Sequence, residues 1–484
     1  MLFNSYEFIF LFLPTVFFIY FYLNRKRLTE VAKAFLIFAS LFFYAWWNIR
    51  YLPLILVSML VNYAIGRELA RHQHNQRSYS SKKLLIAGIV FNLGLLAYFK
   101  YMDFFIQNVN HLLHTHIPLL HLALPLAISF YTFQQISYLV DSYRQETKEY
   151  DFLNYALFVT FFPQLIAGPI VHHSEMMPQF AKTKNKIKDY YNIALGLFLF
   201  SMGLFKKVVI ADTFAQWATK GFDVAKALNM LEAWTTSLSY TLQLYFDFSG
   251  YTDMAIGAAL LFNIKLPINF FSPYKAVNIQ DFWRRWHITL SRFLKEYIYI
   301  PLGGNRKGRA RTYLNLFITF LLGGIWHGAG WTFLLWGMLH GGALVIHRFW
   351  QQLGLRMPKL LGWLVTFMFV NIAWVFFRAN SFQDAIKVLK GMFYGDLVLP
   401  RWLEHYSFIN HQIVKFGNWS KLFSDESLLW LWILSGMVTV LFLPNSMQWK
   451  ARFKTSVFYL LMSVCFFMSI FMLYKKSEFL YFNF

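Results

Sequence analysis

Charged residues are scarce in this chain of 484 residues, where Asp, Glu, Lys and Arg together make up only 14%. An average soluble domain carries about 25% charged residues. Hydrophobic residues instead reach 57% and aromatic residues 21%. This composition argues against a soluble protein and predicts an all-α protein that crosses a membrane several times.

Cysteine is almost absent, since Cys465 is the only one in the chain. A single cysteine excludes a disulfide framework, a thiol pair and a cysteine-based metal site. Cys465 lies in an apolar run, which predicts a small buried residue. No set of His, Asp and Glu residues has metal-ligand spacing, so we expect no metal. The phosphate-binding motif GxxxxGK[ST] and the GxSxG nucleophile elbow are also missing.

Acidic residues are few, at 23 against 45 Lys and Arg, and the net charge is +22. A positive charge of this size is also found in nucleic-acid-binding proteins. Here, however, the basic residues lie in short clusters between apolar runs, as in the loops of membrane proteins. We therefore expect membrane lipid around the protein and no nucleic acid.

Apolar runs are numerous, and a membrane-spanning helix needs about 20 predominantly apolar residues. We expect spans at residues 8–23, 31–47, 52–65, 84–99, 117–140, 193–210, 233–248, 313–325, 332–346, 360–377, 428–443 and 456–473. Residues 152–171 form a weaker candidate, because Pro163 and Pro169 predict a broken or re-entrant segment. The first run has no basic stretch before it and is expected to remain as an anchor. We expect one membrane domain over residues 1–484.

The distribution of Lys and Arg predicts the orientation of these spans. Basic residues follow the first span at 25–27 and the third span at 67–83, and the densest cluster lies within 284–311. These loops are therefore expected in the cytoplasm, with the N-terminus on the other side of the membrane. Charges in the polar insertion at 378–427 nearly balance, so its side is left open.

Residues 282–340 combine basic, aromatic and apolar sequence with two histidines. The first part has apolar side chains at helical spacing, which predicts an interfacial helix with His287 at the edge of its apolar stripe. Those apolar residues are Trp283, Trp286, Leu290, Phe293, Leu294, Tyr297 and Ile298. Two interpretations remain open here. Either His287 is incidental, or Arg284 and Arg285 face a phosphate-bearing donor, which arginine recognises well.

His327 lies in an apolar run and is surrounded by glycines at 323, 324, 328 and 330. Small residues permit close approach of helices or of a ligand. An ionisable side chain at membrane depth is a functional candidate. Burial would keep its imidazole neutral and able to accept a proton. The alternative is a structural histidine bonded to a neighbouring helix.

Asp247 and Asp253 lie beside an apolar span, and we expect Gly250 to break the helix between them. The two carboxylates either form structural ion pairs or line a reaction cavity. The candidate partners are Arg284, Arg285 and Lys206. Asp141 and Arg378 raise the same question at other span ends.

Several runs in the same order resemble the membrane-bound O-acyltransferases, specifically the bacterial alginate O-acetyltransferase branch. They are residues 125–133, 137–144, 162–170, 203–212, 245–255, 282–340 and 374–379. The resemblance implies a ring of about eleven or more spanning helices, with re-entrant helices and two funnels that meet near a catalytic histidine. His327 resembles the near-universal histidine of that family, and His287 resembles its second one.

The last residues, 479–484, read FLYFNF and resemble the C-terminal FxYxxF-type motif of cell-envelope acylation systems. In those systems the tyrosine hydroxyl carries the acyl group, so the resemblance implies an acyl relay at Tyr481. The alternative is a hydrophobic tail that rests on the membrane.

The resemblance implies an acyltransferase of the bacterial inner membrane. It would pass an acetyl group from a cytoplasmic thioester, acetyl-CoA, to a cell-envelope or exported polysaccharide. Arg284 and Arg285 would attract the donor, and His327 would act as base with His287 beside it. Tyr481 would hand the group to an extracytoplasmic polysaccharide acetyltransferase. A D-alanyl or longer acyl donor, a transporter or flippase without covalent chemistry, and a scaffold for a partner transferase remain alternatives. The sequence does not name the acceptor polymer.

Overall fold

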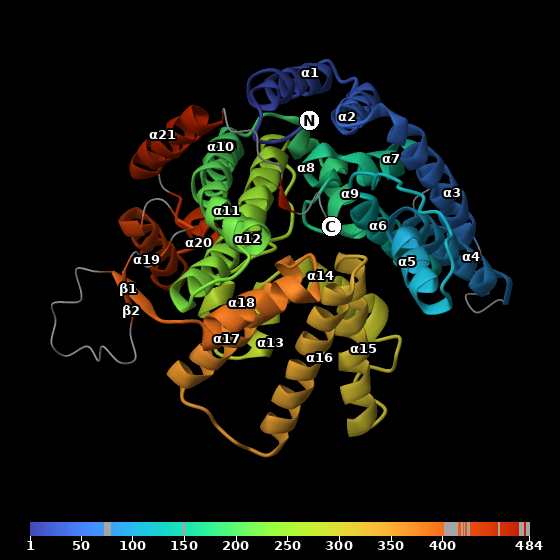
Figure 1. Cartoon of the computed structure of the whole chain (residues 1–484). Helices are drawn as coiled ribbons and strands as arrows, with labels where there is room; N and C mark the ends of the chain where they lie inside the picture. The colour runs from blue at the N-terminus through green and yellow to red at the C-terminus, as the bar shows by residue number, and fades with distance from the viewer. Residues whose placement is uncertain are drawn as a thin grey trace. The chain divides into compact units, whose positions relative to one another are not determined.

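The structure is a computed structural model that describes residues 1–71, 79–147, 151–400, 415–417, 420, 422–423, 426–453, 455–473 and 479–480. Its regular structure is almost entirely helical, as predicted (Figure 1). The chain forms two compact units. The first contains Met1–Phe205, Gly250–Ile268 and Arg452–Phe484, and the second contains Lys206–Ser249 and Asn269–Ala451. Whether they make one domain stays a prediction.

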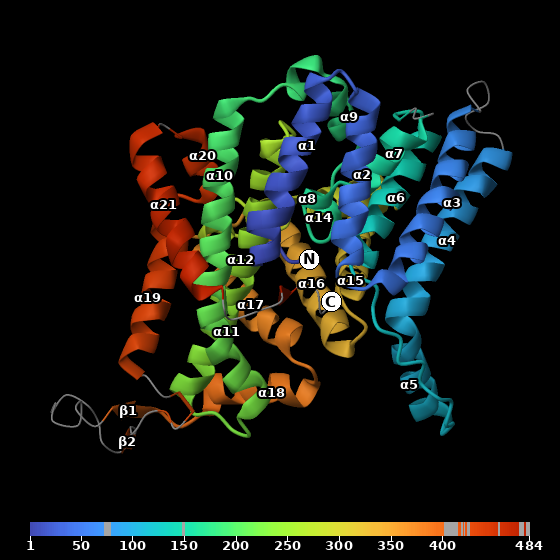
Figure 2. The ribbon, with the colours of Figure 1, turned by 90° about the horizontal axis from the view of Figure 1, so that it is seen from above.

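The first unit is built from helices, with η marking short 3₁₀ or π-helical segments. They are η1 (Glu7–Phe12), α1 (Leu13–Arg25), α2 (Thr29–Ala45), η2 (Ile49–Tyr51), α3 (Leu52–Arg71), α4 (Tyr79–Leu96), η3 (Ala97–Tyr101), α5 (Met102–Leu113), α6 (Ile128–Tyr143), α7 (Phe152–Thr160), α8 (Phe162–Leu165), α9 (His173–Ala181), η4 (Thr183–Lys186), α10 (Tyr190–Phe205) and α21 (Thr455–Met472). Within this unit α1 packs on α2, α4 packs on α3 and α6, and α10 packs on α21 (Figure 2).

The second unit is also helical. It contains η5 (Lys206–Ala211), α11 (Asp212–Thr219), η6 (Lys220–Val224), the first part of α12 (Met230–Leu261), η7 (Pro273–Lys275), α13 (Ile279–Arg285), α14 (Ile288–Leu294), η8 (Lys295–Tyr299), α15 (Arg309–His327), α16 (Trp331–Gln352), α17 (Lys359–Arg378), α18 (Phe382–Tyr394), α19 (Glu426–Phe442) and α20 (Ser446–Ala451). Two short parallel strands, β1 (Val398–Pro400) and β2 (Lys415–Gly417), lie in the polar insertion. Within this unit α15 packs against α16, and the two helices lie side by side in Figure 1.

Aromatic and amide side chains hold the first unit together. The rings of Phe8, Phe12, Phe43 and Phe162 form pairs with centroids between 5.3 and 6.0 Å apart. At the contact of α3 with α4, Asn92 donates to the side-chain oxygen of Asn62 at 2.6 Å, and Asn62 donates back at 3.1 Å. Both amides are buried. Reciprocal hydrogen bonds of this kind join helices where lipid offers no partner.

Five helical stretches among the described residues are long and apolar enough to cross a membrane. They are Glu7–Arg25, Ile49–Arg71, Ser80–Leu113, Tyr190–Val224 and Lys359–Arg378, and shorter apolar helices lie at Leu428–Phe442 and Val457–Met472. A multi-pass membrane protein is therefore confirmed, whereas eleven or more spans stay a prediction. Cys465 is buried in α21, as predicted.

The expected span at 117–140 is wrong in its first part, because α6 begins only at Ile128. The preceding segment contains Pro118 and Pro125, which cannot donate backbone hydrogen bonds. Instead, the carboxylate of Asp103 accepts hydrogen bonds from the backbone nitrogens of Leu120 at 2.7 Å and His121 at 3.0 Å. The predicted break in 152–171 is confirmed, since α7 and α8 are separate helices.

The predicted helix break at Gly250 is also wrong, because α12 runs without interruption from Met230 to Leu261. The close contact at this point depends on a glycine of α10. A methyl group at Gly203 of α10 would lie only 2.5 Å from the carbonyl oxygen of Gly250. About two helical turns further along α12, a methyl group at Gly257 would lie 2.5 Å from the carbonyl oxygen of Gly196. Glycine is thus needed wherever these two backbones meet.

Substitution of Gly257 by alanine should therefore destabilise the protein by about 1–3 kcal/mol, because the new methyl group meets a backbone oxygen that cannot move alone. Thermal unfolding of the purified protein in detergent measures this effect. Gly94→Ala in α4 is the matched control, because nothing lies within 4 Å of its added carbon. Equal stability of the two variants would contradict the packing described here.

Candidate functional site

The segment around His287 is not the single interfacial helix that its apolar spacing predicts. Helix α13 ends at Arg285 and α14 begins at Ile288, with His287 between them at a left-handed φ of 43°. Backbone pairing explains the break. Phe271 donates to the carbonyl of Arg285 at 2.9 Å, and Ile288 donates to the carbonyl of Asn269 at 3.0 Å. These bonds to an extended segment replace the helical ones that residues 285–288 would otherwise form.

The imidazole of His287 is fully buried and its orientation is set by Asn269. The Oδ1 atom of Asn269 accepts hydrogen bonds from the backbone nitrogen of Thr289 at 3.2 Å and from its hydroxyl at 3.0 Å. Because a backbone N–H only donates, the atom that faces it must be the amide oxygen. The Nδ1 atom of His287 lies 3.1 Å from the same oxygen and is therefore the protonated nitrogen. The other ring nitrogen, Nε2, consequently carries a lone pair in the neutral ring.

The electrostatic environment keeps that ring neutral. His287 lies outside the described helices that are long enough to span a membrane. Complete burial lowers the pKa of His287 to about 3, because the charged form would lose its hydration. The ring of Phe248 packs edge-on at 4.8 Å from it. His287 can thus accept a hydrogen bond through Nε2 without becoming a cation at neutral pH.

His327 is the last residue of α15 and is buried among aromatic side chains. Its ring lies 5.1 Å from the ring of Trp336 in α16 and 5.1 Å from that of Phe377 in α17. Close packing of α15 and α16 positions it, since a methyl group at Gly324 would lie 2.5 Å from the carbonyl oxygen of Phe333. The prediction that small residues allow close helix approach here is confirmed.

The structure brings the two predicted histidines together through Trp326. The indole ring of Trp326 lies 4.9 Å from the ring of His327 and 6.4 Å from that of His287. Both imidazoles therefore belong to one buried aromatic cluster, although they come from separate elements. The geometry offers two basic nitrogen-bearing rings in an apolar surrounding, which suits proton transfer to or from a bound hydroxyl.

His340 is a further member of this cluster that the sequence prediction missed. It is completely buried in α16, and its Nδ1 accepts a hydrogen bond from the indole nitrogen of Trp283 at 3.2 Å. The ring of Trp336 lies 4.6 Å from His340 and 5.1 Å from His327, so it touches both. The spacing of four residues between Trp336 and His340 places them on one helix face, which was the available signal. Asn269 had no comparable signal in the sequence.

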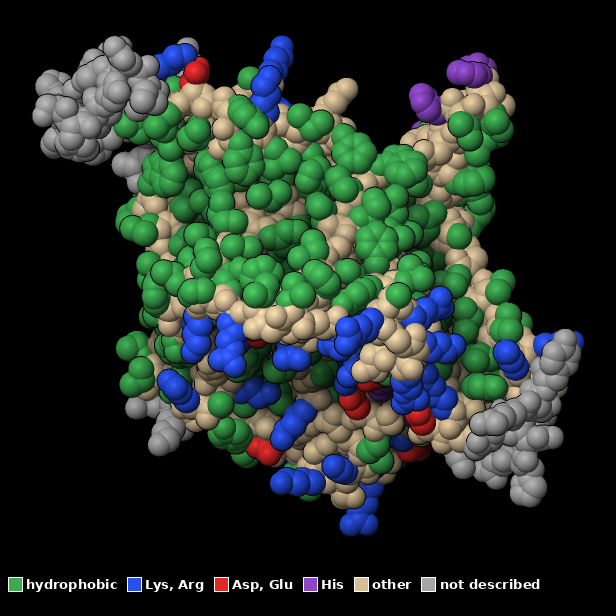
Figure 3. Space-filling view, turned by 90° about the horizontal axis from the view of Figure 1, so that it is seen from below, with side chains coloured by type: hydrophobic (Ala, Val, Ile, Leu, Met, Phe, Trp, Pro, Cys, Tyr) green, Lys and Arg blue, Asp and Glu red, His purple; other side chains and the backbone are tan. Residues whose placement is uncertain are grey.

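Arg284 and Arg285 lie at the end of α13. Arg284 is exposed, whereas the Nε atom of Arg285 is bound to a carboxylate oxygen of Asp281 at 2.8 Å. Neither arginine lines the cavity described below. Elsewhere on the surface, Lys and Arg side chains gather along one margin of a broad hydrophobic area (Figure 3). Such a margin is typical of the lipid boundary of a membrane protein.

The carboxylate of Asp247 has a partner that was not predicted. Asp247 is bound to Lys207, with Nζ 2.7 Å from Oδ1, and the same Nζ lies 2.8 Å from Asp212. The prediction of a structural ion pair at Asp247 is thus confirmed, but its partner here is Lys207, which was not among the predicted ones, and Lys206 donates to the hydroxyl of Ser446. The other two span-end residues form structural pairs. Asp141 accepts from His172 at 3.3 Å, and Arg378 binds Asp223.

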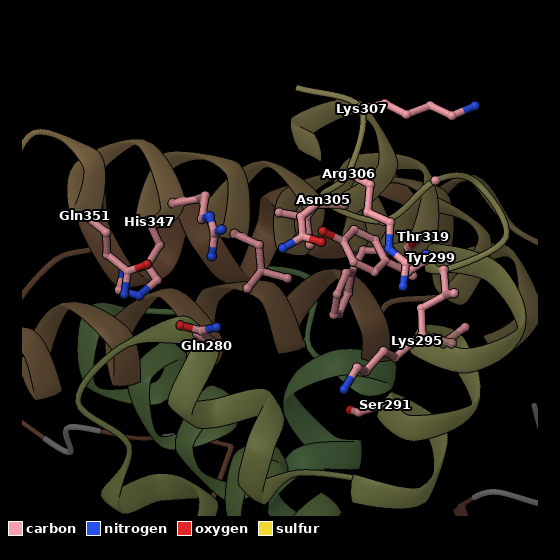
Figure 4. Close-up of a pocket in the computed structure, with 18 residues that line it drawn as sticks. Gln280, Ser291, Lys295, Tyr299, Asn305, Arg306, Lys307, Thr319, His347 and Gln351 are labelled. Carbon is pink, nitrogen blue, oxygen red and sulfur yellow. The ribbon is translucent and has the colours of Figure 1, made fainter. Parts of the chain in front are cut away.

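A cavity of about 640 Å³ lies in the second unit between α13, α14, η8, α15, α16 and the turn at 300–307. Its walls carry the cationic side chains of Lys295, Arg306, Lys307 and Arg348, together with His347. No Asp or Glu lines this cavity in the described part of the chain. Figure 4 shows His347 and Gln351 on one wall and Tyr299, Arg306 and Lys295 on the other. The arrangement suits an anionic group.

The remaining two predictions concern Tyr481 and metal binding. Tyr481 lies outside the described residues. Within the described residues no group of His, Cys, Asp and Glu could hold a metal ion.

Comparison with known proteins relates the sequence of this chain to a family. Residues 34–383 match MBOAT, the membrane-bound O-acyltransferase family. A protein of Helicobacter pylori named peptidoglycan O-acetyltransferase is 56% identical over 423 residues, which cover 81% of this chain and 80% of that protein. A protein of Pseudomonas aeruginosa named probable alginate O-acetylase AlgI is 42% identical over 402 residues, which cover 81% of this chain and 75% of that protein.

A more distant relative is the teichoic acid D-alanyltransferase of Bacillus subtilis, which is 26% identical over 55% of this chain and 72% of that protein. The family match covers most of the chain, and the matched segment contains both buried histidines. The chain therefore belongs to the membrane-bound O-acyltransferase family, and it is a multi-pass membrane acyltransferase.

Proposed function

We propose that this protein is an O-acetyltransferase that takes an acetyl group from a cytoplasmic thioester and delivers it across the membrane for O-acetylation of a polysaccharide. The observation that carries the proposal is the contact of Trp326 with both His287 and His327, which unites the two predicted histidines in one buried cluster. A buried cluster of imidazole and aromatic rings suits acyl transfer to a hydroxyl, because water would otherwise hydrolyse the thioester.

Peptidoglycan is the acceptor polymer that the similarity favours. The relative named peptidoglycan O-acetyltransferase is 56% identical, whereas the relative named alginate O-acetylase is 42% identical. Both names describe acetyl transfer to hydroxyl groups of a polysaccharide. An acetyl group fits this pattern better than the D-alanyl group in the name of the 26% identical relative.

His327 is the proposed general base. Its imidazole would take the proton of the acceptor hydroxyl while the hydroxyl oxygen attacks the thioester carbonyl. The new C–O bond forms as the C–S bond breaks, and the proton then passes from His327 to the departing thiolate. His287 would accept a hydrogen bond through Nε2 from the donor or the acceptor, because its Nδ1–H is already bound to Asn269. His287 is thus a positioning group in this scheme.

Tyr481 is the proposed acceptor of this first transfer. Its phenol would attack the thioester, hold the acetyl group as an ester and pass it to a separate extracytoplasmic polysaccharide acetyltransferase. Phe479, two residues earlier, packs edge-on against Tyr251 with ring centroids 4.7 Å apart. Phe479 is buried, so the chain is still packed against the protein two residues before Tyr481.

His327→Ala should lower O-acetylation of the polymer about 10²- to 10⁴-fold, because removal of a general base has effects of that size. Acetyl esters released from isolated cell wall measure the loss, with the membrane level of the protein checked in parallel. His111→Ala is the control, because His111 is exposed at the end of α5. Near-normal acetylation in His327→Ala at an unchanged protein level would refute the base assignment. It would then favour a transporter or scaffold role.

The pH dependence of acetyl transfer distinguishes the two histidines. Burial lowers the pKa of His287 to about 3, so His287 stays neutral above that value and gains its proton only below it. Between about pH 5 and 8 His287 should therefore add no acid limb to the pH–rate profile. The variant His287→Gln should lower the rate and leave the apparent pKa unchanged. A shifted acid limb in that variant would show that His287 titrates in the wild-type protein.

Tyr481→Phe should abolish transfer to the polymer, because the substituted ring lacks the hydroxyl that would carry the acetyl group. Mass spectrometry of the purified wild-type protein should find an acetyl ester on the C-terminal peptide after incubation with a thioester donor. Phe482→Tyr in the Tyr481→Phe background is a position control, because it restores a phenol at the wrong residue. Unchanged polymer acetylation in Tyr481→Phe would remove the relay from the scheme.

A further inference from the structure

An apolar groove lies in the first unit, bounded by η1 and α1, by α10, by the end of α12 and by α21. Its volume of about 460 Å³ is in the range of small-molecule sites, which is about 300–1,000 Å³. The lining side chains come from residues 9–18, 193–201 and 462–467, together with Leu261. Among them only Ser201 and Ser463 are polar, and none is charged. The groove therefore suits a hydrocarbon chain.

The helices that form the walls of the groove have membrane-spanning character. Both η1 with α1 and α10 belong to stretches that are long and apolar enough to cross a membrane, and α21 is a shorter apolar helix. The three helices run in the same general direction in Figure 2. The lining on η1 and α1 extends from Ile9 to Phe18, about 13 Å along a helix axis. One leaflet of a bilayer supplies about half of a hydrocarbon core of about 30 Å, so the groove matches the acyl chain of one leaflet.

One end of the groove is braced by contacts between η1 and α21. The hydroxyl of Tyr6 donates to the carbonyl of Ile470 at 3.0 Å. The ring of Phe10 lies 6.3 Å from the ring of Phe466, and both of these rings line the groove. The first and last helical segments of this unit are thus joined at one end, and the groove continues from there along α1.

The ammonium group of Lys188 lies over the other end of the groove. Its Nζ atom is 5.6 Å from the ring centroid of Phe17 and 5.2 Å from that of Phe18, and both rings line the groove. The neighbouring carboxylate of Asp189 has another task, because it accepts hydrogen bonds from two backbone nitrogens in the first turn of α10. An ammonium carries three N–H donors, so Lys188 can bind an anion here while it stays over the rings.

Further basic residues lie near this end of the groove. The segment η4, which contains Lys184 and Lys186, packs against α1. Arg25 is the last residue of α1, and Lys26 follows it. Lys and Arg next to a membrane-spanning helix attract anionic lipid headgroups. The charge at this end of the groove therefore favours an anionic lipid over a zwitterionic one.

Packing and charge have separate parts in the recognition of such a lipid. Lipid tails are as apolar as the side chains that line the groove, so the hydrophobic effect does not select a ligand inside a bilayer. An apolar groove without a chain in it does lose dispersion contacts, and a chain of matching length restores them. Lys188 adds a charge that an anionic headgroup matches. Shape thus selects the chain, and charge selects the headgroup.

We propose that this groove binds one anionic diacyl phospholipid, with an acyl chain against Phe17, Leu197 and Phe466 and its phosphate at Lys188. The lipid bridges α1 and α21, which come from opposite ends of the chain, and so stabilises the first unit. The site uses no residue of the histidine cluster. The proposal therefore stands independently of the proposed acetyl transfer.

Native mass spectrometry of the full-length protein, delipidated in detergent, tests the role of the charge. Phosphatidylglycerol and phosphatidylcholine with identical acyl chains are titrated separately. Lys188→Gln should weaken phosphatidylglycerol binding about fivefold and leave phosphatidylcholine binding unchanged, since one lysine near a headgroup contributes about that factor. Lys82→Gln is the matched control, because Lys82 is exposed on α4 and does not line the groove. An equal loss in both variants, or no loss in Lys188→Gln, would overturn the proposal.

A second variant tests the groove itself. Leu197 is 43% exposed, so the larger ring of Leu197→Trp should fill the groove without entering the core. This variant should bind both lipids more weakly. Leu60→Trp is its control, because Leu60 is 56% exposed on α3 and does not line the groove. Phosphatidylglycerol should raise the Tm of the wild-type protein and of Leu60→Trp but not that of Leu197→Trp. An equal rise in all three proteins would contradict the site.

A phosphatidylglycerol with a photoreactive diazirine in one acyl chain locates the lipid without any substitution. Cross-links in the wild-type protein should concentrate in peptides that contain residues 9–18, 193–201 and 462–467. Labels spread evenly over α3 and α4 as well would show boundary lipid only and refute the site. A dimer that Leu197→Trp abolishes would show that the groove receives a helix of a second copy, and it would refute the proposal too.

Discussion

The hydrogen bond between His287 and Asn269 is the interaction on which the candidate site depends. A buried imidazole loses its hydration, and the loss is costly unless its polar atoms are paired. The amide oxygen of Asn269 meets this need and also accepts two hydrogen bonds from Thr289. One oxygen atom therefore holds the chain where it leaves the helix, orients the ring and selects its protonated nitrogen. Phe248 and Trp326 pack against the His287 ring, whose orientation and protonated nitrogen are fixed by Asn269.

Buried polar groups elsewhere in each unit follow the same rule. Asn62 and Asn92 satisfy each other across α3 and α4 in the first unit. In the second unit, Lys207 lies between Asp212 and Asp247, with its ammonium within 2.8 Å of both carboxylates. A buried charge without a partner is strongly unfavourable, so such groups either hold the fold together or serve function. The pairing of Lys207 assigns Asp247 to the fold.

The sequence predicted the class of fold, because apolar length acts locally, and it predicted the close helix approach beside His327 from its glycines. The roles of His287 and His327 stay predictions. It predicted wrongly where tertiary contacts override the local pattern. The spacing from Trp283 to Ile298 is equally compatible with one helix or with two. Backbone pairing of Arg285 and Ile288 with residues 269–271 breaks the helix. Gly250 has low helix propensity, yet α12 continues through it because α10 packs there. The basic cavity could not be predicted, because it depends on distant side chains that only the fold brings together, whereas His340 had a local signal in its spacing from Trp336.

The contact of α15 with α16 has a consequence for how the site meets its lipid environment. Near His327 the two backbones touch, since a methyl group at Gly337 would lie 2.7 Å from the carbonyl oxygen of Phe320. Helices separated by long side chains can slide or tilt to match bilayers of different thickness. Two backbones in direct contact at glycine have no such freedom and must tilt as one body. His327 and Trp336 therefore keep their spacing in thin and in thick membranes, and their packing is decoupled from the thickness of the bilayer.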